Sequence, residues 1–371
     1  MNTLSIVLFF VGLLVVILVH EAAHYSVARL FGFKVEEYFV GFGPKVWSFR
    51  RGEIEYGVKA LPLGGYVKIA GMNPYEPVSE EDLPRAYGSK PRWQRALVIF
   101  SGPASHFVVA FVLFFLVFAV NGDPSGATAI GAVTPRLDGQ VSPAAASGMR
   151  AGDLILAVGP VQNPTFDQIS IYQKAHVGAA ITYTVLRDGH DVTLSITPVR
   201  ANPDGNGARP MIGVILTSGW APVSILGAVP RGLETVGATI KESVVNIGQV
   251  FGPHGWTRLY QGLFEGSPRQ ITDPVSVIGV GQQVGQAGAA GGLLYVLYLL
   301  ALVTVFIGLI NLLPLPPFDG GHLAVIALEK IRGKSVDPRR LIPISVAVMG
   351  TLAVFVLATA FLDIFKPVPG P

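Results

Sequence analysis

Two histidines and a glutamate lie within five residues near the end of an otherwise apolar segment, VILVHEAAHYSVA (16–28). Residues four positions apart share one face of a helix, so His20 and His24 can reach the same metal ion. Glu21 would project beside that ion, toward a water molecule bound to it. Zn²⁺ suits these ligands, since it binds imidazole nitrogen at about 2.0 to 2.1 Å and can leave one position open. The motif therefore predicts a zinc site with a water molecule beside Glu21.

The apolar surroundings of this HExxH motif add to its weight. Ionisable side chains inside a membrane-spanning segment are costly unless something compensates them. A histidine pair satisfied by neighbouring helices, without a metal, is the alternative. We favour the metal site because each polar residue in such a segment needs an energetic justification.

A zinc site needs a third protein ligand at a similar depth in the membrane. The chain has no cysteine, which excludes a thiolate ligand, a thiol nucleophile and any disulfide. Asp319 follows an apolar stretch broken by prolines in NLLPLPPFDGG (311–321). Irregular backbone at membrane depth is tolerated only where protein or a water-filled cavity covers it, so this segment is a candidate site. A helix cap at the membrane surface is the alternative role for Asp319.

Composition indicates a membrane protein that crosses the bilayer about four times. Half of the 371 residues are hydrophobic, only 14% are charged, and the mean hydropathy is +0.52. The first apolar stretch lacks a basic start and a cleavage site, so we expect a span and not a signal peptide. Four stretches approach the length of about 20 apolar residues needed for a span: 4–27, 96–120, 292–313 and 341–363.

Lysine and arginine predict how the chain is oriented in the membrane. The segment 29–95 holds eleven of them, and the connection 330–340 holds five more. The segment 121–291 holds ten over a much greater length. The positive-inside rule then places the first two segments in the cytoplasm, and the third segment and both termini outside. No basic stripe with interleaved aromatic residues indicates a nucleic-acid partner.

Regions outside the spans have strand-like and helix-like patterns. Residues 36–71 alternate polar and apolar types between glycine clusters, which predicts a membrane-associated β-hairpin or small sheet. Residues 181–199 predict a hairpin with Arg-Asp-Gly-His at its turn. Together with SPAAASGMRAGD (142–153), this hairpin resembles a PDZ domain of the bacterial protease type; an unrelated small β domain is the alternative. Residues 231–251 predict an amphipathic helix, lying either on the outer membrane face or against the soluble domain.

These features together resemble the site-2 protease family of intramembrane zinc metalloproteases, peptidase family M50. They are HExxH in the first span, NxxPxPxxDGG in the third, and a PDZ-like insert between spans two and three. The chain is closest to bacterial, single-PDZ, regulator-of-sigma-E-protease-like members that cleave membrane-anchored anti-sigma factors. Further segments that look like family segments are GFGP (41–44), PLGGYVKIAGM (62–72), KPRWQR and SGPASH (90–106) and DPVSVIG (273–279).

The resemblance implies a role for each candidate residue. One zinc ion per chain would be held by His20, His24 and Asp319, with Glu21 as general base and acid. Asn311 would position the substrate or stabilise the oxyanion. His106 stands where many members have the asparagine of GPxxN, and we expect a supporting role for it. We also expect support of the site by His322 and substrate binding by Gly41, Gly43, Pro314 and Pro316.

The resemblance further implies a multi-pass protein of the bacterial cytoplasmic membrane that cleaves transmembrane segments of single-pass proteins. An anti-sigma factor is the expected substrate, and remnant signal peptides are a second one. A β edge within 46–70 would hold the unwound substrate as an added strand, or the hairpin would simply pack on the surface. The PDZ-like domain would exclude bulky substrates or bind new C-termini. The sequence makes no prediction of the oligomeric state.

Two other function classes remain as alternatives to a protease. One is a zinc-dependent membrane transporter or channel, although inverted repeats are absent. The other is a catalytically inactive PDZ scaffold, which the intact HExxH motif disfavours.

The predicted fold is a polytopic α-helical membrane protein with about four transmembrane helices. It carries a cytoplasmic-side, membrane-associated β-hairpin or sheet and an extracytoplasmic PDZ-like α+β domain. The predicted segments are a first transmembrane helix (1–31), a membrane-associated β region with a cytoplasmic loop (32–95), a second transmembrane helix (96–120), the PDZ-like domain (121–201), a linker and amphipathic-helix region (202–291), a third transmembrane helix (292–323), a cytoplasmic connection (324–340), and a fourth transmembrane helix with a C-terminal tail (341–371).

Overall fold

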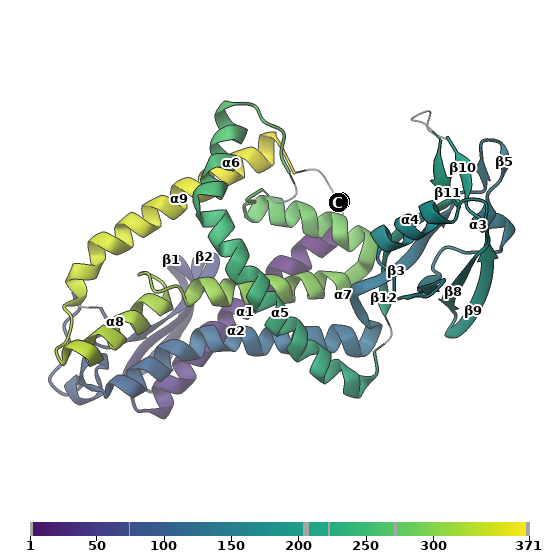
Figure 1. Ribbon diagram of the computed structural model, residues 1–371. Helices are drawn as coiled ribbons and strands as arrows, with labels where there is room; N and C mark the ends of the chain where they lie inside the picture. The colour runs from purple at the N-terminus through teal and green to yellow at the C-terminus, as the bar shows by residue number, and fades with distance from the viewer. Residues whose placement is uncertain (1–2, 74, 203–207, 222, 271–272, 369–371) are drawn as a thin grey trace. The chain divides into compact units, whose positions relative to one another are not determined.

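The chain divides into two compact units (Figure 1). The first unit combines Met1–Phe115 with Arg231–Pro371, and the second, Leu116–Pro230, is inserted between these parts. The computed structural model describes residues 3–73, 75–202, 208–221, 223–270 and 273–368.

Four helices in the described residues are long and apolar enough to cross a membrane. Each of the four predicted spans coincides with one of these helices. The helices are α1 (Thr3–Leu30), α2 (Arg92–Asn121), the second part of α7 (Val277–Asn311) and α9 (Ile342–Phe365), the last preceded by the short helix η3 (Pro338–Leu341).

The third span begins at Gly292, where it was predicted to begin. The helix that contains it, α7, begins earlier, at Val277, and the positive φ of 68° at Gly292 interrupts it. It stops at Asn311, and a new helix, α8 (Asp319–Arg332), begins after a short loop. This end is close to 313, where the apolar stretch was predicted to end, since the three prolines that follow cannot continue a helix interior. The predicted segment up to 323 also includes the loop and the start of α8. The predicted cytoplasmic connection is therefore largely helical.

The N-terminus of α7 is held by a side chain from the end of α9. The fully buried carboxylate of Asp363 accepts hydrogen bonds from the backbone N–H groups of Ser276 (2.6 Å) and Gly279 (3.2 Å). Arg269 donates a further hydrogen bond to it at 3.2 Å. These bonds satisfy helix-end donors that would otherwise have no partner, and they fasten α7 to α9.

The predicted β region forms two long strands, β1 (Val35–Arg51) and β2 (Ile54–Ile69). Both strands bend back, so that residues 35–40 pair with 65–69 on one side and with 55–58 on the other. Residues 45–51 then pair with 54–59 as the outermost segment. The result is a small sheet with 65–69 at one edge.

Glycine makes the bend in β1 possible. Gly41 and Gly43 have φ values of 87° and 85°, a region that residues with a side chain rarely adopt. A Cβ atom on Gly41 would also lie 2.6 Å from the Leu61 carbonyl oxygen. These two glycines, expected to bind substrate, thus have a clear role in shaping the sheet.

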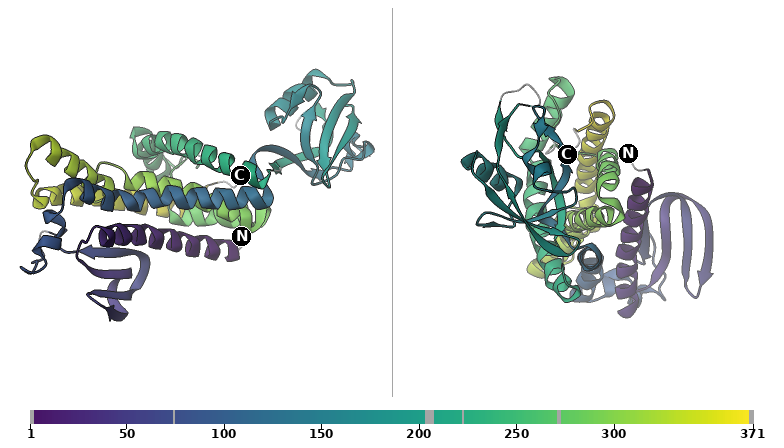
Figure 2. Two further views of the ribbon diagram at one scale, coloured as in Figure 1. Left: turned by 90° about the horizontal axis from the view of Figure 1, so that it is seen from below. Right: turned by 90° about the vertical axis from the view of Figure 1, so that its right-hand side faces the viewer.

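Helix α1 lies between this sheet and the other membrane helices, as both views of Figure 2 show. One of its faces packs with β1, β2 and α2 in a buried cluster that includes Ala28, Ile69 and Val98. Phe9 and Val16 pack against α7 in a second cluster. Because both faces of α1 are fixed, the orientation of side chains at its C-terminal end is fixed as well.

The second unit is a twisted antiparallel sheet with the strand order β12–β3–β6–β8–β9. Its core includes Ile130, Ile155 and Tyr183, and Ile169 of helix α4 packs into the same core. The predicted hairpin is confirmed as β8 and β9, with φ values of 50° and 80° at Asp188 and Gly189 in its turn. The bounds are β3 Asp123–Val133, β6 Leu154–Val158, α4 Phe166–Ala175, β8 Ile181–Arg187, β9 His190–Ile196 and β12 Val214–Ala221.

The sheet continues beyond residue 201, where the soluble domain was predicted to end. Strand β12 pairs with β3, at the start of the unit, so the segment from 214 to 221, which overlaps the strand-like sequence MIGVILTS (211–218), belongs to the sheet. The sequence missed this pairing because it joins residues far apart in the chain. The expected linker around 202–210 falls mainly on 203–207, which lie outside the described residues. On either side of this segment, β10 (Val199–Ala201) pairs with β11 (Arg209–Met211).

The amphipathic helix predicted over 231–251 forms as α5 (Ile225–Phe251). A further helix, α6 (Pro253–Phe264), follows it and packs against α9 through Leu259, Phe355 and Leu362. The sequence did not predict α6. The remaining short elements are η1 Leu83–Arg85, η2 Tyr87–Ser89, β4 Arg136–Leu137, β5 Gln140–Val141, α3 Pro143–Ala146 and β7 Val161–Gln162.

A buried ion pair fastens two parts of the second unit. Asp153, whose side chain is 1% exposed, accepts hydrogen bonds from Arg187 at 2.7 and 2.6 Å. Its carboxylate also accepts one from the Arg150 backbone N–H at 2.8 Å. Burial alone would raise the pKa of Asp153, but these hydrogen bonds hold it below its ordinary value.

We expect Arg187→Met to lower the free energy of unfolding of this unit by about 3 to 5 kcal/mol, since it leaves a buried carboxylate without its partner. The folded-state pKa of Asp153 is below the unfolded value, so its stabilisation is present above the ordinary carboxyl pKa and lost as pH falls below it. Hydrogen exchange of the β6 and β8 amides, corrected for intrinsic rates, measures both effects. Asp191→Asn, an exposed position on β9, is the control. Equal protection in both variants would contradict this account.

Candidate metal centre

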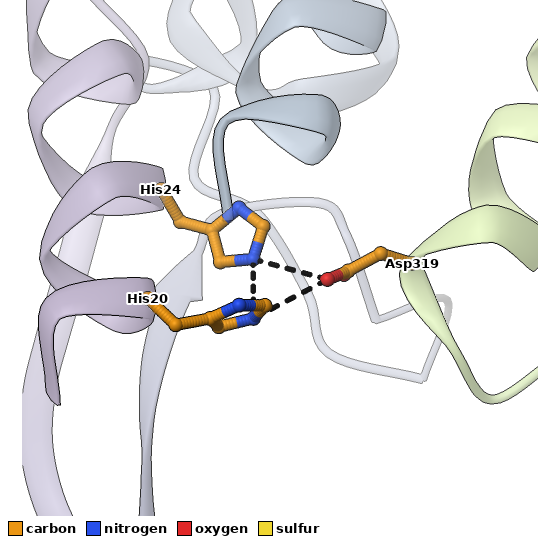
Figure 3. A group of neighbouring side chains, drawn as sticks. All are labelled: His20, His24 and Asp319. Atoms are coloured by element: carbon orange, nitrogen blue, oxygen red, sulfur yellow. Dashed lines mark hydrogen bonds and ion pairs between the residues drawn. The ribbon is translucent and has the colours of Figure 1, made fainter. Parts of the chain in front are cut away.

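His20, His24 and Asp319 converge on one point from α1 and from the start of α8 (Figure 3). The two histidine Nε2 atoms are 3.1 Å apart. Asp319 Oδ2 lies 3.3 Å from Nε2 of His20 and 3.4 Å from Nε2 of His24. Both histidines are 8% exposed. Among the described residues, these three make up the one group of at least three such side chains placed to hold a metal ion.

The geometry of this triad fits zinc. Donor atoms at about 2.0 to 2.1 Å from a tetrahedral centre lie about 3.3 to 3.4 Å from one another. The three observed separations of 3.1, 3.3 and 3.4 Å form a triangle of nearly this size. Two imidazoles and one carboxylate would leave the fourth position open, as in catalytic zinc sites.

The hydrogen bond of His24 to the backbone prepares its ring for a metal. Its Nδ1 lies 2.7 Å from the Val98 carbonyl oxygen on α2. A carbonyl can only accept, so we assign the proton to Nδ1, which leaves the lone pair of Nε2 directed at the triad. That lone pair faces an imidazole nitrogen and a carboxylate oxygen. These electron-rich atoms repel one another, and a cation bound between them would remove that repulsion.

Helix α2 comes close to the triad through a glycine. A Cβ atom on Gly102 would lie 2.2 Å from His24 Nε2 and 2.7 Å from His20 Cε1. Real Cβ atoms do not approach so closely, so any side chain here would displace the histidines. Sequence reasoning grouped Gly102 with the segment SGPASH but missed this role. The sequence feature that could have indicated this role is the position of Gly102 itself, a glycine within an apolar span and directly before Pro103.

The loop before α8 sets the position of Asp319. It folds back on the first turn of the helix, where a Cβ on Gly320 would lie 2.2 Å from the Leu312 carbonyl oxygen. A Cβ on Gly321 would lie 2.5 Å from the Pro316 nitrogen. At the other end of α8, Glu329 forms a buried ion pair of 2.6 Å with Arg95 of α2. Both ends of α8 are thus held.

Two cavities meet at the triad. The larger one has a volume of about 280 Å³, and the smaller one about 160 Å³. Glu21 lines both, whereas neither cavity is lined by His322. Besides His20, Glu21 and Asp319, which are common to both, the larger cavity is lined by Ile17, Phe42, Gly64, Gly65, His106, Ile307, Asn311, Pro317 and Phe318, and the smaller by His24, Tyr66, Val67, Ile69, Met72, Val98 and Ile99.

Several predicted site residues therefore lie together, and others do not. Asn311 and His106 line the larger cavity together with His20 and Asp319. Pro314 and Pro316 were expected to bind substrate, but neither lines this cavity. Pro317 lines it instead. Proline spacing alone cannot tell which ring faces a cavity, because the path of the loop depends on its packing against α8.

Comparison with known proteins assigns the chain to a family. The model of Peptidase family M50 matches residues 8–357. The chain belongs to this family. Zinc metalloprotease Rip1 of Mycobacterium tuberculosis is 32% identical over 98% of this chain and 98% of its own. A Brucella suis protein named as a zinc metalloprotease is 33% identical over 90% of this chain and 88% of its own. Another, from Clostridium acetobutylicum, is 27% identical over 99% of both chains.

The family assignment confirms three predictions from the sequence. The chain is a zinc metalloprotease, its cofactor is zinc, and it is a membrane protein that acts on protein substrates. The transporter and the inactive scaffold are correspondingly disfavoured.

We expect Gly102→Ala to reduce bound zinc to well below one ion per chain, because the added methyl group would displace the imidazole of His24. Elemental analysis of the purified protein measures this directly. The control is Gly350→Ala, at a glycine of α9 with open space around its Cβ position. Full zinc occupancy in the Gly102 variant would show that the triad tolerates a side chain there.

Proposed function

We propose that the chain is an intramembrane zinc endopeptidase that cleaves transmembrane segments of single-pass membrane proteins. In this proposal His20, His24 and Asp319 hold the zinc, and Glu21 is the general base and acid. The observation that carries it is the convergence of three ligand atoms, two from the apolar helix α1 and one from the start of α8, with Glu21 beside them.

The two cavities suggest how water and substrate are kept apart. Bound zinc would lower the pKa of a coordinated water and polarise the scissile carbonyl. The smaller cavity, at about 160 Å³, has room for only a few water molecules, each taking about 30 Å³ in the liquid. The larger cavity is the better match for a peptide segment. Glu21 lines both, so it can take a proton from the water and deliver it to the leaving amine.

The sheet edge at 65–69 is well placed to hold the substrate. A transmembrane helix hides its carbonyl groups in hydrogen bonds, so it must unwind before cleavage. Residues 65–69 pair with 35–40 on one side, and no described strand pairs with their other side. A Cβ on Gly65 would lie 3.2 Å from Glu21 Cγ, and Val67 lines the smaller cavity. An unwound segment added to this edge would run past the catalytic residues.

The second unit supports an assignment as a PDZ-like domain on the outer side of the membrane. Its short helix α3, which Ser142 of the SPA sequence caps, is followed along the chain by α4 and by the closing β8–β9 hairpin, which is the order expected of such a domain. The lysine and arginine distribution supports placing this unit and both termini outside the cytoplasmic membrane of a bacterium. The unit would exclude bulky substrates or bind C-termini, and an anti-sigma factor or a remnant signal peptide is the proposed substrate.

We expect Glu21→Gln to lower cleavage of a reconstituted model transmembrane substrate by at least about 10²-fold, since it removes the general base. Zinc content should stay at one ion per chain because Glu21 is not a ligand. Glu265→Gln, an exposed position after α6, should cleave normally.

Three outcomes separate the function classes. Loss of cleavage with zinc retained supports the protease mechanism. Zinc transport across the same proteoliposomes, unaffected by the substitution, would favour a transporter. No cleavage by the unsubstituted protein would favour a scaffold, and unchanged cleavage by the variant would rule out Glu21 as the base.

A further inference from the structure

A third histidine lies beside the triad, on a different helix. His106 of α2 is 1% exposed, and its ring centroid is 4.9 Å from that of His20. It lines the larger cavity together with Asn311. The approach of α2 to α7 at this point requires a glycine: a Cβ on Gly308 would lie 2.8 Å from His106 Cβ.

His106 is outside the set of metal ligands. The ligand atoms of His20, His24 and Asp319 all lie within 4.8 Å of one another, and His106 is not part of that group. It does not line the smaller cavity, where water would enter. Its place is therefore on the side of the triad that we assign to the substrate.

The surroundings of the ring favour one tautomer. Nδ1 of His106 is buried and has no hydrogen-bond partner, whereas Nε2 is not among the buried unpartnered atoms. A buried N–H without an acceptor is costly. We therefore assign the proton of the neutral ring to Nε2; the residue lines the larger cavity.

We propose that His106 is a catalytic residue whose Nε2–H donates a hydrogen bond to the carbonyl oxygen of the scissile peptide. This inference rests on the proposed function of the triad and adds a donor for the negative charge that develops on that oxygen. The ring stays neutral throughout, and no proton leaves it. An asparagine side chain at this position would also offer an N–H donor.

Kinetics of His106→Leu and His106→Asn in proteoliposomes test the proposal. Loss of one oxyanion donor typically lowers kcat by about 10²- to 10³-fold. We expect this loss for His106→Leu, with KM little changed and zinc still at one ion per chain. His106→Asn should recover most of kcat. Val108→Ala, at a 62% exposed position of the same helix, is the control and should be unaffected.

A second readout does not depend on turnover. A phosphinic peptide has tetrahedral oxygens like the reaction's transition state, so His106→Leu should weaken its binding by a factor similar to the loss of kcat. In a structure of the unsubstituted protein with this inhibitor, Nε2 of His106 should lie within about 3.2 Å of a phosphinate oxygen.

Any one of four results would overturn the proposal. These are normal kcat in His106→Leu, loss of zinc from that variant, a change in KM alone, or an inhibitor complex in which Nε2 contacts the metal or no oxygen. None of them would affect the role of Glu21, whose substitution tests the proposed function separately.

Discussion

In the proposed metal site, the attraction of two imidazoles and one carboxylate for a shared cation is the interaction on which the rest of the account depends. Their donor atoms lie within 3.4 Å of one another and are buried among apolar helices. Without a cation, three acceptors at this distance would repel, and their desolvation would have no compensation. With zinc, the same burial becomes useful, because it excludes lipid and most water from a strongly polarising site.

Small residues allow the helices to come close enough to build this site. Gly102 lets α2 pass directly behind the histidines, and Gly320 lets the proline-rich loop fold onto α8. Gly308 makes room for His106 between α2 and α7. Helices in a membrane associate through close packing and not through a hydrophobic driving force. Glycines at the contact points therefore determine how closely these helices pack. A methyl group at these glycines is therefore expected to act on chemistry as much as on stability.

The sequence predicted those parts of the fold and site whose signals are local. Apolar length gave the four spans, HExxH placed two histidines on one helix face, and the prolines before Asp319 marked irregular backbone at membrane depth. Other features depend on contacts between distant segments. The pairing of β12 with β3, the doubled-back sheet of β1 and β2, and the approach of Gly102 to His24 have no local pattern. The loop's packing, and not its proline spacing, decides that Pro317 faces the cavity.

X-ray absorption at the zinc edge, on detergent-solubilised protein with one zinc per chain, tests the central claim most directly. The account predicts two imidazole nitrogens and one carboxylate oxygen at about 2.0 to 2.2 Å, and one oxygen from solvent. In Asp319→Asn, either the zinc should be lost or the carboxylate scattering should change while both imidazoles remain. A first shell without two imidazoles, or one unaltered by that substitution, would contradict the account.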